Sequence, residues 1–162
     1  MEASSREGIL CALQANYAEC ARQLDGVTEE DAGLRPDENQ WSIKEALAHL
    51  LICDEFAQAR LVRIVHETDP YLSGFDDHQL LQVRGYRGTA ACEIRDTLLA
   101  FGQATLNLLG GLSEHQWQRT ARHEERGPIT IGYIAGQMLA EHHREHLEQI
   151  HDLKRWLAAR QP

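Results

Sequence analysis

Histidine is the residue of this chain whose number and spacing point to chemistry. The chain of 162 residues contains nine histidines. Four of them fall within ten residues near the C-terminus: His142, His143, His146 and His151. His142 and His146 are four residues apart, so on a helix their side chains lie on one face, one turn above the other. Two imidazoles at this spacing can bind one metal ion with their nitrogens about 2.0–2.1 Å from it.

The apolar pattern around this pair predicts that both histidines face inward. A buried imidazole needs partners for its nitrogens, and one metal ion would satisfy two such rings at once. The same spacing also occurs in hydrogen-bonded or solvent-facing histidines that bind no metal. His143 is predicted to point more than a quarter turn away from His142, at the surface or boundary of the helix. The inward stripe of this helix reads Ile131, Ala135, Met138 or Leu139, His142, His146, Gln149 or Ile150, Leu153 and Leu157.

His49 is a third candidate ligand, because it lies beside the apolar stripe of an earlier predicted helix. A lone histidine at such a place is ordinarily a hydrogen-bonded core or boundary residue. In a helix bundle, however, facing helices can supply one ligand from one helix and two from another. Three imidazoles leave one coordination position open, which is the ligand count of a catalytic zinc site. Zinc, nickel, copper and iron all accept imidazole, so the ligand type alone does not choose the metal.

Acidic residues near the three histidines could orient the imidazoles. Asp54 follows His49 by five residues, and Glu141 and Glu145 neighbour the C-terminal pair. Carboxylates commonly hold ligating histidines in place, although most acids on helices are simply solvated. His123 is kept as a candidate lid residue. No residue stands out as a general base, so catalytic residues stay unassigned.

The elements that must position these residues are predicted to be helices. Ser42 and Glu45 form a capping-box pattern at the start of the second long helix. The fold expected is an all-α four-helix bundle, running up-down-up-down, in one domain over residues 1–162. A short strand or hairpin is expected in residues 121–132, before the last helix. The helices are expected at about Ser5–Leu24, Ser42 to just before Asp69, Thr89–Leu109 and Thr130–Ala159, with short ones at Asp77–Val83 and Ser113–Trp117.

The composition limits the classes of partner that this chain is expected to bind. A net charge of -9 would repel phosphate backbones and anionic lipid, so neither nucleic acid nor a membrane is an expected partner. No apolar run approaches the ~18 residues that span a bilayer, and the polar, acidic start of the chain does not read as a secretory signal. A cytoplasmic protein is expected. The four cysteines form no Cys-x-x-Cys pair and are predicted to be buried apolar residues: Cys11, Cys20, Cys53 and Cys92.

Two stretches of the chain resemble the DinB-like superfamily, which includes the YfiT-type proteins. The first is WSIKEALAHLLICDEF, residues 41–56, and the second is ITIGYIAGQMLAEHHREHLEQIHDL, residues 129–153. His49 falls on the first metal position of the family, and His142 and His146 fall on the second and third. Asp54 matches an acidic position of the family, whereas Cys53 stands where a further Asp is often found.

The resemblance implies a metal-dependent enzyme, of a thiol S-transferase or hydrolase type, that uses zinc or nickel at an open three-histidine site. A small-molecule substrate is expected, with a low-molecular-weight thiol as one candidate, and so is a homodimer. The sequence does not decide whether the protein is an enzyme. The alternatives are a non-catalytic metal-binding or stress-responsive dimeric helical module, and a metal-free dimerisation domain whose histidines form a polar network in the core.

Overall fold

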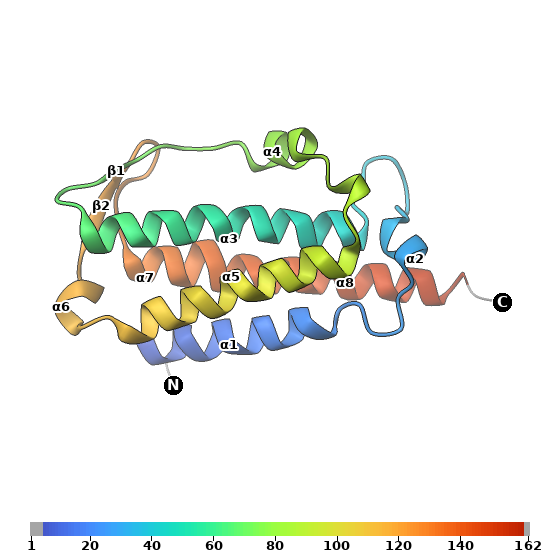
Figure 1. Cartoon of the computed structure of the whole chain (residues 1–162), viewed down its shortest axis with the longest axis horizontal. Coiled ribbons are helices and arrows are strands. Elements are labelled where there is room, and N and C mark those ends of the chain that lie inside the picture. The colour runs from blue at the N-terminus through green and yellow to red at the C-terminus, as the bar shows by residue number, and fades with distance from the viewer. Residues whose placement is uncertain (1–4, 161–162) are drawn as a thin grey trace.

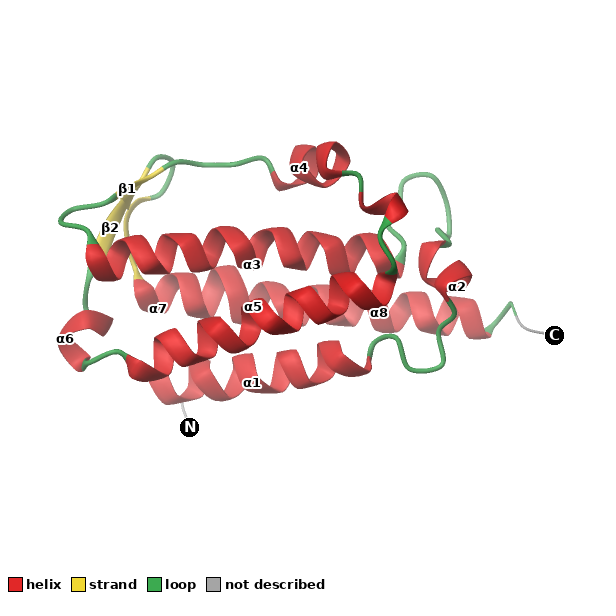
Figure 2. Cartoon of the chain, viewed as in Figure 1, coloured by secondary structure: helices red, strands yellow, loops and turns green. Residues whose placement is uncertain are grey.

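Four long helices lie side by side in a computed structural model that describes residues 5–160 (Figure 1). They are α1 (Arg6–Arg22), α3 (Ile43–His66), α5 (Ala91–Gly111) and a last helix built from α7 (Ile131–Tyr133), the π-helical stretch η2 (Ile134–Glu141) and α8 (His142–Ala158). Strands are confined to one end of the bundle (Figure 2). The predicted all-α four-helix bundle is confirmed.

Side-chain caps fix where three of these helices begin, and the Oγ atom of Ser5 accepts the backbone N–H of Gly8 at the start of α1. Ser42 Oγ accepts the backbone N–H of Glu45, and the Glu45 carboxylate accepts the backbone N–H of Ser42, which is the predicted capping box of α3. Thr130 Oγ1 accepts the backbone N–H of Tyr133 at the start of α7. Each such cap stabilises the protein by about 1 kcal/mol, because it satisfies a backbone donor that has no partner within the helix.

The directions of the helices differ from the expected alternation. Arg6, at the start of α1, donates to the carbonyl of Leu112 just after α5, so these two helices are antiparallel. The carboxylate of Glu29 binds both Lys44 near the start of α3 and the backbone N–H of Ala91 at the start of α5. Therefore α3 and α5 run parallel, and the predicted up-down-up-down order is wrong at this step.

The segment between α3 and α5 explains this direction, because it returns along the length of the bundle before α5 begins (Figure 1). It contains β1 (Tyr71–Leu72), α4 (Asp77–Arg84) and the 3-10 turn η1 (Tyr86–Gly88). The short helix predicted at residues 77–83 is thus present as α4. Gly85 ends it with φ 59°, a left-handed conformation that glycine adopts at little cost. As a result, α4 packs over α3.

A three-stranded sheet closes one end of the bundle. β2 (Thr120–His123) and β3 (Gly127–Thr130) form the hairpin predicted before the last helix. β1 from the crossover segment adds to β2 in parallel, giving the order β1-β2-β3. Two short helices complete the chain, α2 (Glu29–Gly33) and α6 (Glu114–Trp117). The sheet therefore ties the start of the crossover segment to the hairpin.

Apolar side chains from all four long helices fill the core, including Leu13, Leu47, Leu98 and Ile150, each with no exposed surface. Burying a side chain of this size contributes about 1.5–3 kcal/mol. No helix within residues 5–160 is both long and apolar enough to cross a membrane. The prediction of buried cysteines is confirmed for Cys20 and Cys53 and is wrong for Cys11 and Cys92, which are exposed.

The helices α1 and α5 pack closely together at Gly102. A Cβ atom on this residue would lie 2.5 Å from the ring of Tyr17, a distance that packed side chains do not reach. Tyr17 is itself buried, at 6% exposure, so its ring has little room to move away. A glycine is therefore required at this point of the interface.

We expect Gly102→Ala to lower the free energy of unfolding by about 1–3 kcal/mol, because the added methyl group overpacks the α1–α5 contact. Gly110→Ala is the matched control on the same helix, since a Cβ there meets nothing within 4 Å. That change should be neutral or stabilising by up to ~1 kcal/mol. Urea denaturation measures both, and equal stability of the two variants would contradict the packing argument.

Candidate metal centre

The structure brings together the three histidines predicted as ligands. His49 projects from α3, and His142 and His146 project from successive turns of α8. The Nε2 atom of His142 lies 3.0 Å from Nε2 of His49 and 3.0 Å from Nε2 of His146. Nitrogens bound to one tetrahedral ion at about 2.0–2.1 Å would be roughly 3.3 Å apart. The three rings are therefore close to the arrangement that one ion requires.

The surroundings keep these three rings uncharged near neutral pH. Burial and the neighbouring histidines lower the pKa of His49 to about 3. Burial, His146 and His143 lower the pKa of His142 to about 4. Burial also lowers the pKa of His146. Each ring thus keeps a lone pair, which is the form that binds a metal.

Two neighbours hold the rings in place. The Trp41 ring stacks on His146 at 5.7 Å between centroids and lies tilted against His49 at 4.8 Å. The Oε1 atom of Gln149 lies 2.8 Å from Nδ1 of His146. If Gln149 accepts the Nδ1 proton, Nε2 of His146 is left free to bind a metal. The orientation of His146 is therefore fixed from one face by Trp41 and at its second nitrogen by Gln149.

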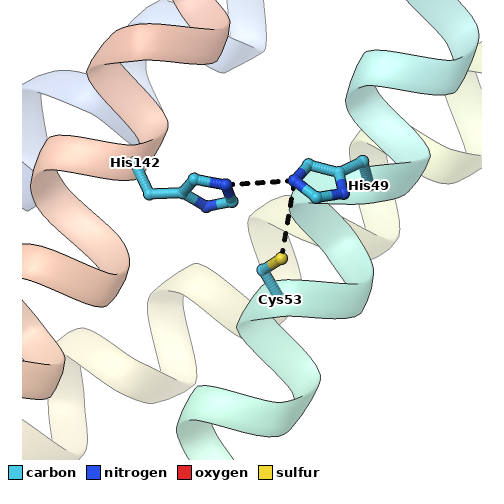
Figure 3. Close-up of side chains that lie close together, drawn as sticks. All are labelled: His49, Cys53 and His142. Atoms are coloured by element: carbon cyan, nitrogen blue, oxygen red, sulfur yellow. Dashed lines mark hydrogen bonds between the residues drawn. The ribbon is translucent and has the colours of Figure 1, made fainter. Parts of the chain in front are cut away.

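Cys53 is a possible donor that the sequence analysis treated as a buried apolar residue. Its Sγ atom lies 3.7 Å from Nε2 of His49, one helical turn away on α3 (Figure 3). The ligand atoms of His49, Cys53 and His142 all lie within 4.8 Å of one another. Burial, with the charges of Asp77 and Asp54, raises the pKa of the Cys53 thiol. The i, i+4 spacing from His49 is the signal that could have identified it.

His143 is fully buried, so its predicted place at the helix surface or boundary is wrong. Its Nε2 atom lies 2.6 Å from Oδ1 of Asp54, and Tyr17 donates its hydroxyl to Oδ2 of Asp54 at 2.7 Å. Burial alone would lower the pKa of His143, but the adjacent Asp54 carboxylate raises it above the ordinary value. The pair is therefore a buried ion pair that joins α8 to α3, with α1 contributing Tyr17.

The π-helical stretch η2 explains the error. A π-helix holds more residues per turn than an α-helix, so the face presented to the core shifts along the sequence. His142 and His146 consequently stand beside the buried stripe and are only half-buried, where the sequence pattern placed them within it. The buried stripe that begins within η2 and continues along α8 is Leu139, His143, Leu147, Ile150, Leu153 and Leu157.

The acids named from the sequence do not contact the three candidate ligands. Asp54 is occupied by His143 and Tyr17. Glu141 forms an exposed ion pair with Arg144, and no hydrogen bond among the described residues joins Glu145 to a candidate ligand. The carboxylate beside the site is instead that of Asp77, whose Oδ2 atom lies 3.8 Å from Nε2 of His49. Asp77 begins α4, so the crossover segment delivers it to the site.

A cleft of about 400 Å³ opens beside this centre. Cys53, Asp77 and His142 line the part of the cleft next to the histidine cluster. His123, the predicted lid residue, is buried in the wall of the cleft, at 4% exposure, and its Nδ1 atom accepts the backbone N–H of Glu125. The rest of the wall comes from Ala57, Arg60, Gly74, Phe75, Glu125, Arg126, Tyr133, Gln137 and Met138.

This chain is similar in sequence to a protein superfamily and to a bacterial protein. The model of the DinB superfamily matches residues 12–150. A protein of Oceanobacillus iheyensis named "Putative metal-dependent hydrolase" is 29% identical over 114 residues. That match covers 70% of this chain and 64% of the relative, so the chain spans less than two thirds of the relative's length.

Solved structures show the same fold. YfiT from Bacillus subtilis, described as "a probable metal-dependent hydrolase with an unusual four-helix bundle topology", has a TM-score of 0.85 and 16% identity. The match covers 98% of this chain and 90% of YfiT. The colibactin self-resistance protein ClbS, solved in complex with a dsDNA, has a TM-score of 0.70 and 16% identity, with 95% and 98% covered. At this identity the likeness extends to the fold alone.

The lowered histidine pKa values predict how the stability of the metal-free protein depends on pH. An unfolded chain binds a proton on His49 near pH 6.5, whereas the native protein binds it only near about pH 3. Acidification through this window therefore favours the unfolded state. Between about pH 7 and pH 5 the free energy of unfolding should fall by roughly 2 kcal/mol through His49 alone.

Urea denaturation in the presence of a chelator measures this dependence. We expect His49→Gln to flatten the fall, and His115→Gln, at an exposed position, to leave it unchanged. The raised pKa of His143 acts in the opposite direction, mainly above pH 6.5, where stability is lost as the pH rises. Because it acts equally in the wild type and in His49→Gln, it cancels when their slopes are compared. Equal slopes for the wild type and His49→Gln would contradict the burial of a neutral His49.

Proposed function

We propose that this chain, which belongs to the DinB superfamily, is a metal-dependent hydrolase whose ion is held by His49, His142 and His146. The observation that carries the proposal is the convergence of three uncharged imidazoles on one point. The Nε2 atom of His142 lies 3.0 Å from Nε2 of His49 and 3.0 Å from Nε2 of His146. A divalent ion with an open position lowers the pKa of a bound water toward ~7 and so supplies a nucleophile at neutral pH. We propose zinc or nickel, since imidazole nitrogen suits both.

Asp77 is the proposed proton acceptor. Its carboxylate is one-third exposed, lines the cleft and lies 3.8 Å from Nε2 of His49. A general base must reach the proton that it removes, directly or through one water. Among the residues that line the cleft, Asp77 is a carboxylate beside the histidines, whereas Glu125 lies on the hairpin turn. The short helix α4, which begins at Asp77, would thus position the proposed base.

Cys53 favours a second function. If its sulfur binds the ion as a thiolate, the donor set becomes three histidines and one cysteine, which is the closed, four-ligand pattern of a structural site. The protein would then be a metal-binding module without catalysis. The 3.7 Å contact between Cys53 Sγ and His49 Nε2 is the observation that supports this alternative.

The substrate of the proposed enzyme is a small molecule that fits the cleft. A transferase, in which a low-molecular-weight thiol takes the place of water, would use the same three histidine ligands. Dimer formation, which the family resemblance suggested, stays a prediction that light scattering after size-exclusion chromatography can measure. The expectation that the chain binds no nucleic acid also stays a prediction.

Metal content tests the ligand set. We expect wild-type protein without a histidine tag to bind close to one zinc or nickel ion per chain at neutral pH. A His142→Ala, His146→Ala double variant should lose this ion, because one imidazole does not hold it. A His66→Ala, His115→Ala double variant removes two exposed histidines and should keep it. Elemental analysis after dialysis decides, and equal metal content in the first two proteins would refute the site.

Cobalt(II) substitution separates the open site from the closed one. A cysteine ligand gives an intense near-ultraviolet thiolate-to-cobalt band, which a three-histidine site lacks. We expect the wild-type cobalt protein to lack this band and Cys53→Ala to leave the spectrum unchanged. A band that disappears in Cys53→Ala would instead establish the closed site and the non-catalytic function.

Asp77→Asn tests the proton acceptor. We expect hydrolysis of p-nitrophenyl acetate by the zinc-loaded protein to slow by about 100-fold or more, since general-base catalysis contributes about 10²–10⁴-fold, while zinc content stays constant. Asp152→Asn, at an exposed residue of α8 paired with Arg155, is the control. An unchanged rate would rule out the base. Turnover that requires an added thiol would identify the protein as a transferase.

A further inference from the structure

One buried cation in the cleft has no counter-ion among the residues that the structure describes. Arg60 lies on α3, seven residues after Cys53, and is only 6% exposed. Its guanidinium donates to the carbonyl of Ser73 at 2.6 Å and stacks over the ring of Phe75 at 4.9 Å. Among residues 5–160, no carboxylate oxygen lies within 4.0 Å of the Arg60 guanidinium, the distance that would make an ion pair. Burying an unpaired charge is costly, so this guanidinium calls for an anion.

A second cation stands nearby. Arg126, on the hairpin turn, lines the same cleft and donates a hydrogen bond to the hydroxyl of Tyr133 at 3.1 Å. Burial lowers the pKa of Arg60, and the charge of Arg126 lowers it further, against smaller opposing effects of Cys53 and Glu125. Burial, Arg60 and Arg126 likewise lower the pKa of His123, against a smaller opposing effect of Glu125 and Glu124. This end of the cleft is therefore at positive potential.

The two acids that line the cleft leave that potential in place. Asp77 stands at the histidine end. Glu125 is exposed on the hairpin turn, with its carboxylate beside Gly74, and forms no ion pair with Arg60 or Arg126 among the described contacts. The cleft thus has the histidines and Asp77 at one end and two unpaired guanidinium groups at the other.

We propose that Arg60, with Arg126, forms a carboxylate-binding subsite, so that the substrate is a small molecule with a carboxylate on the side remote from the histidines. This inference rests on the proposed function for what happens at the other end of the cleft. A planar guanidinium matches a carboxylate with two parallel hydrogen bonds. Seven residues of helix separate Cys53 and Arg60 by about 10 Å, which is the span of a small organic molecule. The volume of about 400 Å³ is at the lower end of the range for small-molecule sites.

Glutarate is the probe, and its neutral diamide, glutaramide, is the matched control ligand. Titrations are followed by ¹H–¹⁵N NMR through the Nε–Hε resonance of Arg60 and the backbone amides of residues 73–75. Metal-free and zinc-loaded wild-type protein are both used, because the metal could itself bind a carboxylate. We expect glutarate to bind both forms and glutaramide to bind neither comparably.

The variants separate binding from folding. We expect Arg60→Gln to weaken glutarate binding about tenfold or more, since a hydrogen bond to a charged group has an effect of this size. Arg126→Gln, at an exposed residue, should weaken binding severalfold, and Glu125→Gln should strengthen it, because it removes a competing negative charge. Arg60→Lys keeps the charge and covers the case in which Arg60→Gln does not fold. Arg63→Gln, one turn along α3 and paired with Glu67, should have no effect.

The subsite would be overturned if glutaramide bound as tightly as glutarate, or if millimolar glutarate shifted no resonance. It would also be overturned if glutarate bound only to the zinc-loaded form. A fourth contrary result is an unchanged affinity for glutarate both in Arg126→Gln and in whichever of Arg60→Gln and Arg60→Lys is folded. The metal test is independent of these titrations. Glutarate binding without metal binding would remove the proposed function and leave the subsite. Metal binding without glutarate binding would do the reverse.

Discussion

The buried ion pair between Asp54 and His143 sets the geometry on which the site depends. Both side chains have no exposed surface, and Tyr17 closes the pair from α1. Removing one partner would leave an uncompensated buried charge, which typically costs about 3–5 kcal/mol. The pair therefore fixes how α8 is rotated against α3. Because His142 precedes His143 by one residue, the same contact directs the His142 ring toward His49.

This arrangement divides the histidines of α8 by task. His143 is held protonated by Asp54, inside the core. His142 and His146 are held neutral by burial, at the edge of the core. Neighbouring histidines on one helix thus differ in protonation state, one charged and the other neutral. The division depends on η2, whose extra residue per turn moves His143 onto the buried face and His142 to the margin beside the cleft.

The long crossover gives the cleft its other walls. Because α5 runs parallel to α3, the chain must return along the bundle between them, and it does so over the face of α3 that carries His49 (Figure 1). The return brings Asp77 to the histidines. It also adds β1 to the hairpin, which holds His123 in the wall and Arg126 at its rim. An alternating bundle with short loops would have left this face open to solvent.

The long helices, the capping box of Ser42 and Glu45, the hairpin and the candidate ligands could all be predicted from the sequence. These follow from local periodicity, from turn chemistry and from the family resemblance of two short stretches. Local patterns do not contain the direction in which α5 re-enters the bundle, nor a change of helical pitch before His142. The tertiary structure alone shows that His143 is buried, that Asp54 forms an ion pair with it, and that Asp77 lies beside His49. The physical reason is that these relations join residues tens of positions apart, through packing that no single helix specifies.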